Sequence, residues 1–289
     1  MNPKLGIASK EKIEAVRELK SSEYQEYQKA LAHLMRFSSD QQLFAIVRLN
    51  YDDYLNLVKQ YLGGYAKNPS MYQGRMERMA LDINRSILNF LSAVRTFLDH
   101  SETNLKKRYG KDSQKVKRFK KACSKAFDDN FSYRFLYKLR NYVQHCGMPL
   151  GTLDLHSKAV GPQPTDVHHS LSVRFNREKL LSEFDWGNRL AEEIQKLPLE
   201  FEISPHLTEM MKCIEMIMLT LVEDYSSELI QSAIYIRQLV KPIKDMPGVP
   251  CILKIKDLTG ERKELNIQIR WIPLHLVEMV MRIAENTRA

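Results

Sequence analysis

Apolar side chains recur every three or four positions over most of this chain, which is the spacing of one face of an α-helix. The pattern covers residues 9–36 and 41–62, where Gly63 and Gly64 interrupt it. It returns from 71 to 108, a stretch that contains no proline. We therefore expect two helices before residue 63 and one long helix after it.

Two shorter helices are expected next. After Gly110, the pattern resumes with Val116 and Phe119 on its inner face. A further helix can begin at Ser132, a residue type that caps helix N-termini, and end before Gly147.

The middle of the chain combines one strand with more helix. Residues 149–166 are rich in glycine, proline and threonine and are expected to form a loop, whereas the alternation over 170–175 predicts one short strand. Helices should follow over 176–196, with a break near 185–187, and over 205–240.

The tail has a different pattern, with a β-hairpin expected from residues 251–256 and 265–271 around Thr259-Gly260, followed by a helix over 274–284. We therefore predict a mainly α protein: a helical bundle with one short central strand and a small C-terminal β-hairpin plus helix. Its expected divisions are an N-terminal helical segment (1–70), the bundle (71–245) and the hairpin-containing tail (246–289).

Positive charge is concentrated in one segment. The chain has a formal net charge of +9, and residues 105–125 hold ten basic residues against one acid, Asp112, so the rest of the chain is neutral. The ten are Lys106, Lys107, Arg108, Lys111, Lys115, Lys117, Arg118, Lys120, Lys121 and Lys125. Such a block favours a nucleic-acid partner, because lysine and arginine release counterions from a phosphate backbone. The alternative is a solvated helix surface with no partner.

Cysteine spacing and hydropathy bear on the compartment. The four cysteines lie far apart without a Cys-x-x-Cys pair, and no apolar run is long enough to span a bilayer. We expect a cytoplasmic protein that does not enter a membrane.

Metal-ligand residue types gather in the central loop. They are Asp154, His156, Asp166, His168 and His169. Their spacing matches no recognised metal motif, so we expect neither a metal site nor another cofactor.

The helix after Ser132 carries the main candidate for chemistry. At about 100° per residue, with Arg140 as zero, its polar groups fall within about 140°. They are Tyr133, Tyr137, Arg140, Asn141, Gln144 and His145. Histidine can carry protons near neutral pH, and arginine can stabilise a phosphate that gains charge. The alternative is that both cations only interact with the negative end of the helix dipole.

Residues 139–145, Leu-Arg-Asn-Tyr-Val-Gln-His, resemble the R-N-x-x-x-H form of the R-x(4–6)-H motif of the HEPN superfamily. The resemblance extends over about residues 71–240. It implies an all-helical bundle, a homodimer with two motif helices at one cleft, and metal-independent cleavage of RNA in toxin-antitoxin or antiviral defence systems. An antitoxin or another regulatory protein is then an expected partner. Arg140 and His145 would be catalytic, together with Asn141.

The resemblance also indicates accessory positions. Some members have a tyrosine two positions after the histidine, where this chain has Gly147, so the role of that tyrosine is either absent or taken by Tyr137 or Tyr142. Gln144 shares a face with Tyr137. Asn84 and Arg95, on the preceding long helix, are candidates for a supporting polar group. Ordinary satisfied polar groups explain them equally well. A non-catalytic HEPN-like module that binds nucleic acid or protein is the alternative function.

Overall fold

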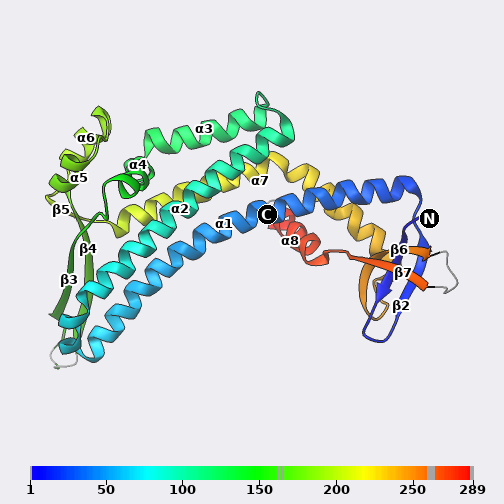
Figure 1. Ribbon diagram of the computed structural model, residues 1–289, viewed down its shortest axis with the longest axis horizontal. Helices are drawn as coiled ribbons and strands as arrows, with labels where there is room; N and C mark the ends of the chain where they lie inside the picture. The colour runs from blue at the N-terminus through cyan, green and yellow to red at the C-terminus, as the bar shows by residue number, and fades with distance from the viewer. Residues whose placement is uncertain (1, 162, 164–165, 259–263, 287–289) are drawn as a thin grey trace. The chain divides into compact units, whose positions relative to one another are not determined.

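A computed structural model describes residues 2–161, 163, 166–258 and 264–286 and shows a mainly α protein with two small antiparallel sheets (Figure 1). The chain forms two compact units. The terminal unit joins Met1–Gln41 to Tyr225–Ala289, and the central unit is Gln42–Asp224. These bounds differ from the three segments expected from the sequence, because each of two long helices contributes to both units.

The first of these helices, α1 (Ser21–Lys67), replaces the two helices expected before residue 63. Gly63 and Gly64 do not end it. A Cβ atom on Gly64 would lie 1.9 Å from the hydroxyl oxygen of Tyr72, so the glycine allows Tyr72 to pack against the helix backbone. The stop expected at these glycines was wrong because the packing of Tyr72, at a cost of about 1 kcal/mol in helix propensity, outweighs the usual role of glycine as a helix stop.

The prediction that a helix begins at residue 9 was wrong. The chain there forms a β-hairpin of β1 (Lys4–Ala8) and β2 (Ile13–Glu18), and the helix begins at Ser21. β1 also pairs antiparallel with β6 (Val249–Leu258), which pairs with β7 (Glu264–Trp271). The order is β2-β1-β6-β7.

The C-terminal hairpin is therefore confirmed, but it shares its sheet with the first strands of the chain. Leu5 lies opposite Ile252, and both side chains are fully buried. The helix after the hairpin is α8 (Leu274–Asn286), as expected. The turn expected at Thr259-Gly260 lies outside the described residues.

The central unit contains the expected long helix, α2 (Met76–Tyr109), after a short 3₁₀ helix, η1 (Pro69–Arg75). The basic segment continues into α3 (Gln114–Asp129), and α4 (Phe131–His145) follows. The side chain of Asn130, rather than that of Ser132, caps α4, since its Oδ1 accepts a hydrogen bond from the backbone N–H of Tyr133 at 2.9 Å. The Ser132 hydroxyl instead contacts His206 Nδ1 at 2.7 Å.

A three-stranded sheet corrects the prediction of a single central strand. Most of the expected loop is β3 (Leu150–Ala159), which pairs with β4 (Val167–Asn176), and β5 (Glu200–Glu202) completes the order β3-β4-β5. The sequence did not predict β3, because Gly151 near its start obscured the alternation of Leu153 and Leu155 with polar residues that is typical of a strand.

Two short helices and a long one complete the unit. α5 (Arg177–Glu183) and α6 (Asn188–Gln195) are separated at Trp186 and Gly187, as the sequence indicated. The buried Trp186 donates its indole N–H to the carbonyl oxygen of Leu180 at 2.7 Å, and Gly187 takes a φ of 74°. The expected helix over 205–240 is α7 (Ser204–Val240).

Candidate functional site

One side of α4 is anchored in the core. Phe135, Leu136, Leu139 and Tyr142 have no exposed surface. Burial and a hydrogen bond to the carboxylate of Glu183 both raise the pKa of the Tyr142 hydroxyl. These contacts fix the rotation of α4 and therefore which residues face outward.

The opposite side carries the polar residues of the motif, which we call the α4 strip: Tyr137, Arg140, Asn141, Gln144 and His145. Asn141, Gln144 and His145 are exposed, whereas Tyr137 and Arg140 are half-buried. Tyr133, which the helical wheel placed with them, is only 2% exposed and belongs to the core instead.

A hydrogen bond orients Arg140 along the strip. A terminal nitrogen of its guanidinium donates to Gln144 Oε1 at 2.6 Å, one helical turn closer to His145. Arg140 Nε is buried without a hydrogen-bond partner. Among the described residues, no hydrogen bond or ion pair engages the side chains of Asn141 and His145. The strip thus offers one oriented guanidinium, one amide and one imidazole to a ligand.

Tyr137 connects the strip to α2. Arg95 of α2 donates a hydrogen bond to the Tyr137 hydroxyl, and its guanidinium carbon lies 5.1 Å from the centre of the Tyr137 ring. Arg95 Nε also donates to Asp99 Oδ2 at 2.8 Å. Two of the accessory residues named from the sequence are therefore in contact.

Asn84 makes no hydrogen bond to the strip among the described residues. It precedes Arg95 by eleven residues on α2, a distance of about 16 Å along the helix axis. Asn84 is half-buried, and its Oδ1 is buried without a hydrogen-bond partner.

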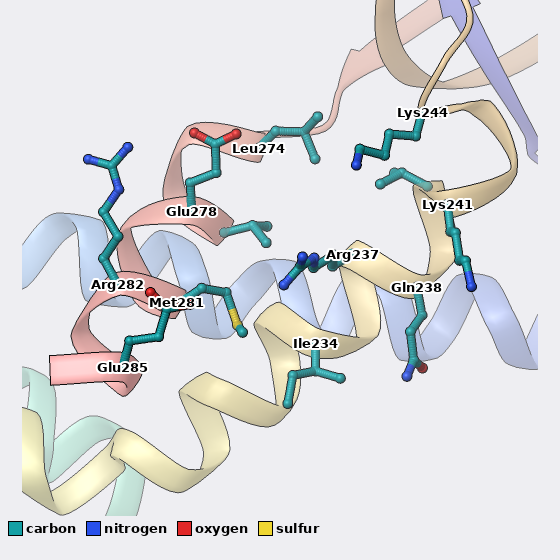
Figure 2. A pocket seen from close by; sticks show the side chains of 12 residues that line it. Ile234, Arg237, Gln238, Lys241, Lys244, Leu274, Glu278, Met281, Arg282 and Glu285 are labelled. Carbon is teal, nitrogen blue, oxygen red and sulfur yellow. The ribbon is translucent and has the colours of Figure 1, made fainter. Parts of the chain in front are cut away.

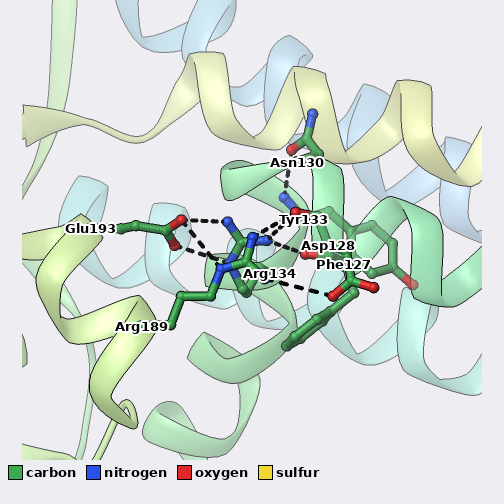
Figure 3. Close-up of polar contacts among 7 residues, drawn as sticks. All are labelled: Phe127, Asp128, Asn130, Tyr133, Arg134, Arg189 and Glu193. Atoms are coloured by element: carbon green, nitrogen blue, oxygen red, sulfur yellow. Dashed lines mark hydrogen bonds and ion pairs between the residues drawn. The ribbon is translucent and has the colours of Figure 1, made fainter.

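Arg134 is a residue that the sequence analysis missed. It is 4% exposed and makes two hydrogen bonds to the Glu193 carboxylate of α6, at 2.6 and 3.0 Å (Figure 3). It also donates to the carbonyl oxygens of Phe127 and Asp128 near the end of α3. Arg134 thus joins α3, α4 and α6.

The row of α4 that contains Arg134 is covered at one end and exposed at the other. Residues 134, 138, 141 and 145 follow one row of α4 at helical spacing. The first two are engaged, because Arg134 binds Glu193 and Lys138 Nζ donates to the carbonyl oxygen of Trp186 at 2.5 Å. Asn141 and His145 continue the row beyond these contacts. Spacing alone therefore groups these four residues, but only tertiary packing separates the covered half from the exposed half.

The structure divides the ten basic residues into two groups. One group makes contacts within the chain: Lys106 and Lys120 bind Glu102 at 2.6 and 3.3 Å, Arg118 binds Asp224 at 2.5 Å, and Lys125 binds Asp129. Lys115 and Arg108 lie over the ring of Tyr109, at 4.1 and 4.7 Å from its centre.

Neighbouring carboxylates respond differently to these cations. The hydrogen bond from Lys106, helped by the bond from Lys120, holds the pKa of Glu102 below its usual value. Burial raises the pKa of Asp224 despite the contact with Arg118. These basic residues therefore serve the fold and are not all available to a partner.

The second group comprises Lys107, Lys111, Lys117 and Lys121, which are exposed and have no ion-pair partner among the described residues. Lys117 and Lys121 lie four positions apart on α3 and therefore share one face. We call these four residues the outer lysines.

The alternative metal site does not form a cluster. No group of three or more His, Cys, Asp or Glu side chains is placed to hold an ion within the part of the chain that the structure describes. Asp154 binds Arg174 at 3.1 Å, and His169 Nδ1 contacts the Ser157 hydroxyl at 2.9 Å. These contacts account for two of the five candidate ligands.

Comparisons with family models, with curated proteins and with solved structures find no match for this chain. In the described residues, none of the helices combines the length and the apolar character needed to cross a bilayer. The α4 strip, with the sequence motif within it, is therefore the feature of this chain that points to a function.

Proposed function

We propose that this protein is a metal-independent endoribonuclease of the HEPN type, with Arg140 and His145 in catalytic roles. The observation that carries the proposal is the exposure of Asn141 and His145 beside an Arg140 held along the same helix. Most other polar residues of α4 contact the protein itself. This strip remains accessible to a phosphate.

The proposed reaction is an attack of the RNA 2′-hydroxyl on the adjacent phosphorus. His145 takes the proton from the hydroxyl, Arg140 stabilises the charge on the non-bridging oxygens, and the bond to the 5′-oxygen breaks. A second acid protonates that oxygen. The products are a 2′,3′-cyclic phosphate and a free 5′-hydroxyl, as atom and proton balance requires.

One copy of α4 supplies only half of this chemistry. His145 is the strip's one imidazole, whereas the reaction needs both a base and an acid. Arg140 and His145 also lie about 7.5 Å apart along the helix and about 140° around it. A second copy of the chain would supply the second His145, so the proposal includes a homodimer with two facing α4 strips.

The single test is RNA cleavage in excess chelator. Wild type should cleave RNA and leave cyclic phosphate ends, and His145→Ala and Arg140→Ala should each lose at least about 100-fold of this activity. His100→Ala and Arg36→Ala are matched controls, because both residues are exposed and lie outside the strip. Undiminished cleavage by His145→Ala would refute the proposal.

A second candidate function is RNA binding without cleavage. The outer lysines favour it, because they provide unpaired positive charge independently of the α4 strip. Salt-sensitive RNA binding by a chain that leaves RNA intact, even at high protein concentration, would favour this reading. An absence of RNA binding would exclude both candidates.

A further inference from the structure

A groove in the terminal unit lies apart from all residues discussed so far. It runs between the end of α7, with the 3₁₀ turn η2 (Lys241–Ile243) after it, and α8 (Figure 2). Its volume is about 840 Å³, within the range of about 300–1,000 Å³ that is usual for ligand sites. The groove is therefore large enough to hold several side chains of a partner.

The floor of the groove is apolar. Val240 and Val277 are buried beneath it, Leu274 and Met281 are half-buried, and Ile234 is 38% exposed. In Figure 2, Met281 of α8 and Arg237 of α7 point toward one another across the groove. An occupant must therefore offer apolar side chains that replace water over these residues.

The two rims differ in charge. Arg237, Lys241 and Lys244 follow α7 and η2 at spacings of four and three residues, so they share one side. The α8 rim has Glu278, Arg282 and Glu285. All six are exposed, and none makes an ion pair with another described residue. The α7 rim thus carries three uncompensated positive charges, and the α8 rim has a small excess of negative charge.

We propose that this groove binds an amphipathic helical peptide segment of a partner protein, with acidic residues along the flank that faces α7. The lining of α8 extends from Leu274 to Glu285, about 16 Å, which matches three turns of a bound helix. The apolar face of the peptide lies on the floor, and its acids pair with the α7 rim. None of the twelve lining residues is aromatic, which favours a peptide over RNA, whose exposed bases stack on aromatic rings.

The test uses the full chain and two synthetic fluorescent peptides of about 14 residues, which span the groove as helices. Both have leucine at helical spacing, and one has glutamate where the other has lysine on a single flank. The acidic peptide should bind at least about tenfold tighter than the basic one, and its affinity should fall as salt rises.

Charge reversal makes the test specific to the groove. The triple variant Arg237→Glu, Lys241→Glu, Lys244→Glu should bind the basic peptide in preference to the acidic one. Ile234→Glu should weaken binding of the acidic peptide through the floor. Lys10→Glu with Lys29→Glu is the matched control, because both lysines are exposed in the same unit and outside the groove.

Three results would overturn the inference: equal binding of the two peptides, no binding of the acidic peptide at about 1 mM, or a preference that survives charge reversal. Circular dichroism of each variant verifies its folding, which should be retained because the substituted residues are exposed. The groove and the α4 strip share no residue, so this outcome and that of the RNA cleavage test are separate.

Discussion

The guanidinium of Arg95 lies over the ring of Tyr137 and also donates a hydrogen bond to its hydroxyl. Arg95 belongs to α2 and Tyr137 to α4, so this pair fixes the place where the exposed strip of α4 meets the long helix of the central unit. The side chain of Arg95 is 38% exposed, which limits the energy of the contact.

A double-mutant cycle should measure that energy. Arg95→Ala and Tyr137→Ala should each lower the free energy of unfolding, with a coupling of about 0.5–1 kcal/mol in urea denaturation. Asp99→Ala is the control, since it removes only an exposed ion pair on α2 and should couple to Arg95 by about 0.5 kcal/mol or less. Strict additivity of Arg95→Ala and Tyr137→Ala would show that their contact contributes no stability.

Removal of Arg134 should have a much larger effect. Arg134→Ala removes the closest ion-pair partner of Glu193 and the guanidinium that binds the last carbonyl groups of α3, leaving only the more distant Arg189, and we expect a loss of about 1.5–3 kcal/mol in the free energy of unfolding. Arg189→Ala tests the same region as a control. Its side chain is 59% exposed, so the loss should stay below about 1 kcal/mol in the same urea titration. Similar losses for the two variants would contradict the central role of Arg134.

The outer lysines can be separated from the paired lysines by salt-dependent RNA binding. Lys117→Ala with Lys121→Ala should lower the slope of log affinity against log salt by about 1.4 for single-stranded RNA, or about 0.7 for each lost phosphate contact. Lys106→Ala with Lys120→Ala removes the same charge but affects residues that bind Glu102, so its slope should change less. Equal changes in fluorescence titrations would mean that the pairing does not decide which lysines contact RNA.

His206 should make stability depend on pH. Burial lowers its pKa from the usual 6.5, so the unfolded chain takes up a proton at a higher pH than the folded chain. Stability is therefore unaffected by this group well above pH 6.5 and falls as the pH drops through 6.5 toward the folded-state pKa. His206→Phe retains a ring beside Phe131 and Phe135 and should lose part of this pH dependence. Urea denaturation from pH 8 to pH 5, about the range of histidine titration, measures it. Identical pH profiles for wild type and His206→Phe would refute the assignment.

Local sequence patterns predicted the elements whose packing is also local. The apolar row of α2 contains Ile83, Ile87 and Leu91, and all three are buried as expected. The break between α5 and α6 was also predictable, because the glycine at position 187 that ends the helical pattern lies within the same short segment. The pairing of β1 with β6 was not predictable in this way, because the two strands lie more than 240 residues apart in the sequence.

The candidate site was predictable only in part. The motif led to Arg140 and His145 as candidates, whereas the contact between Arg95 and Tyr137 was not predictable from the sequence. The wheel misplaced Tyr133 and gave no sign that Arg134 is buried by α6. Residue spacing reports which side chains share a face, whereas partners from distant segments decide which part of that face is covered.

The sheet of the terminal unit also determines an order of events during synthesis. Strand β1 gains its second hydrogen-bonded neighbour only after residues 249–253 have been made, whereas Gln42–Asp224 contains all partners of the sheet formed by β3, β4 and β5. The central unit can therefore fold on the nascent chain, and β1 with β2 must wait as an isolated hairpin, which is marginally stable in water. Strands β6 and β7, which are made after the central unit, complete the sheet that β1 and β2 began.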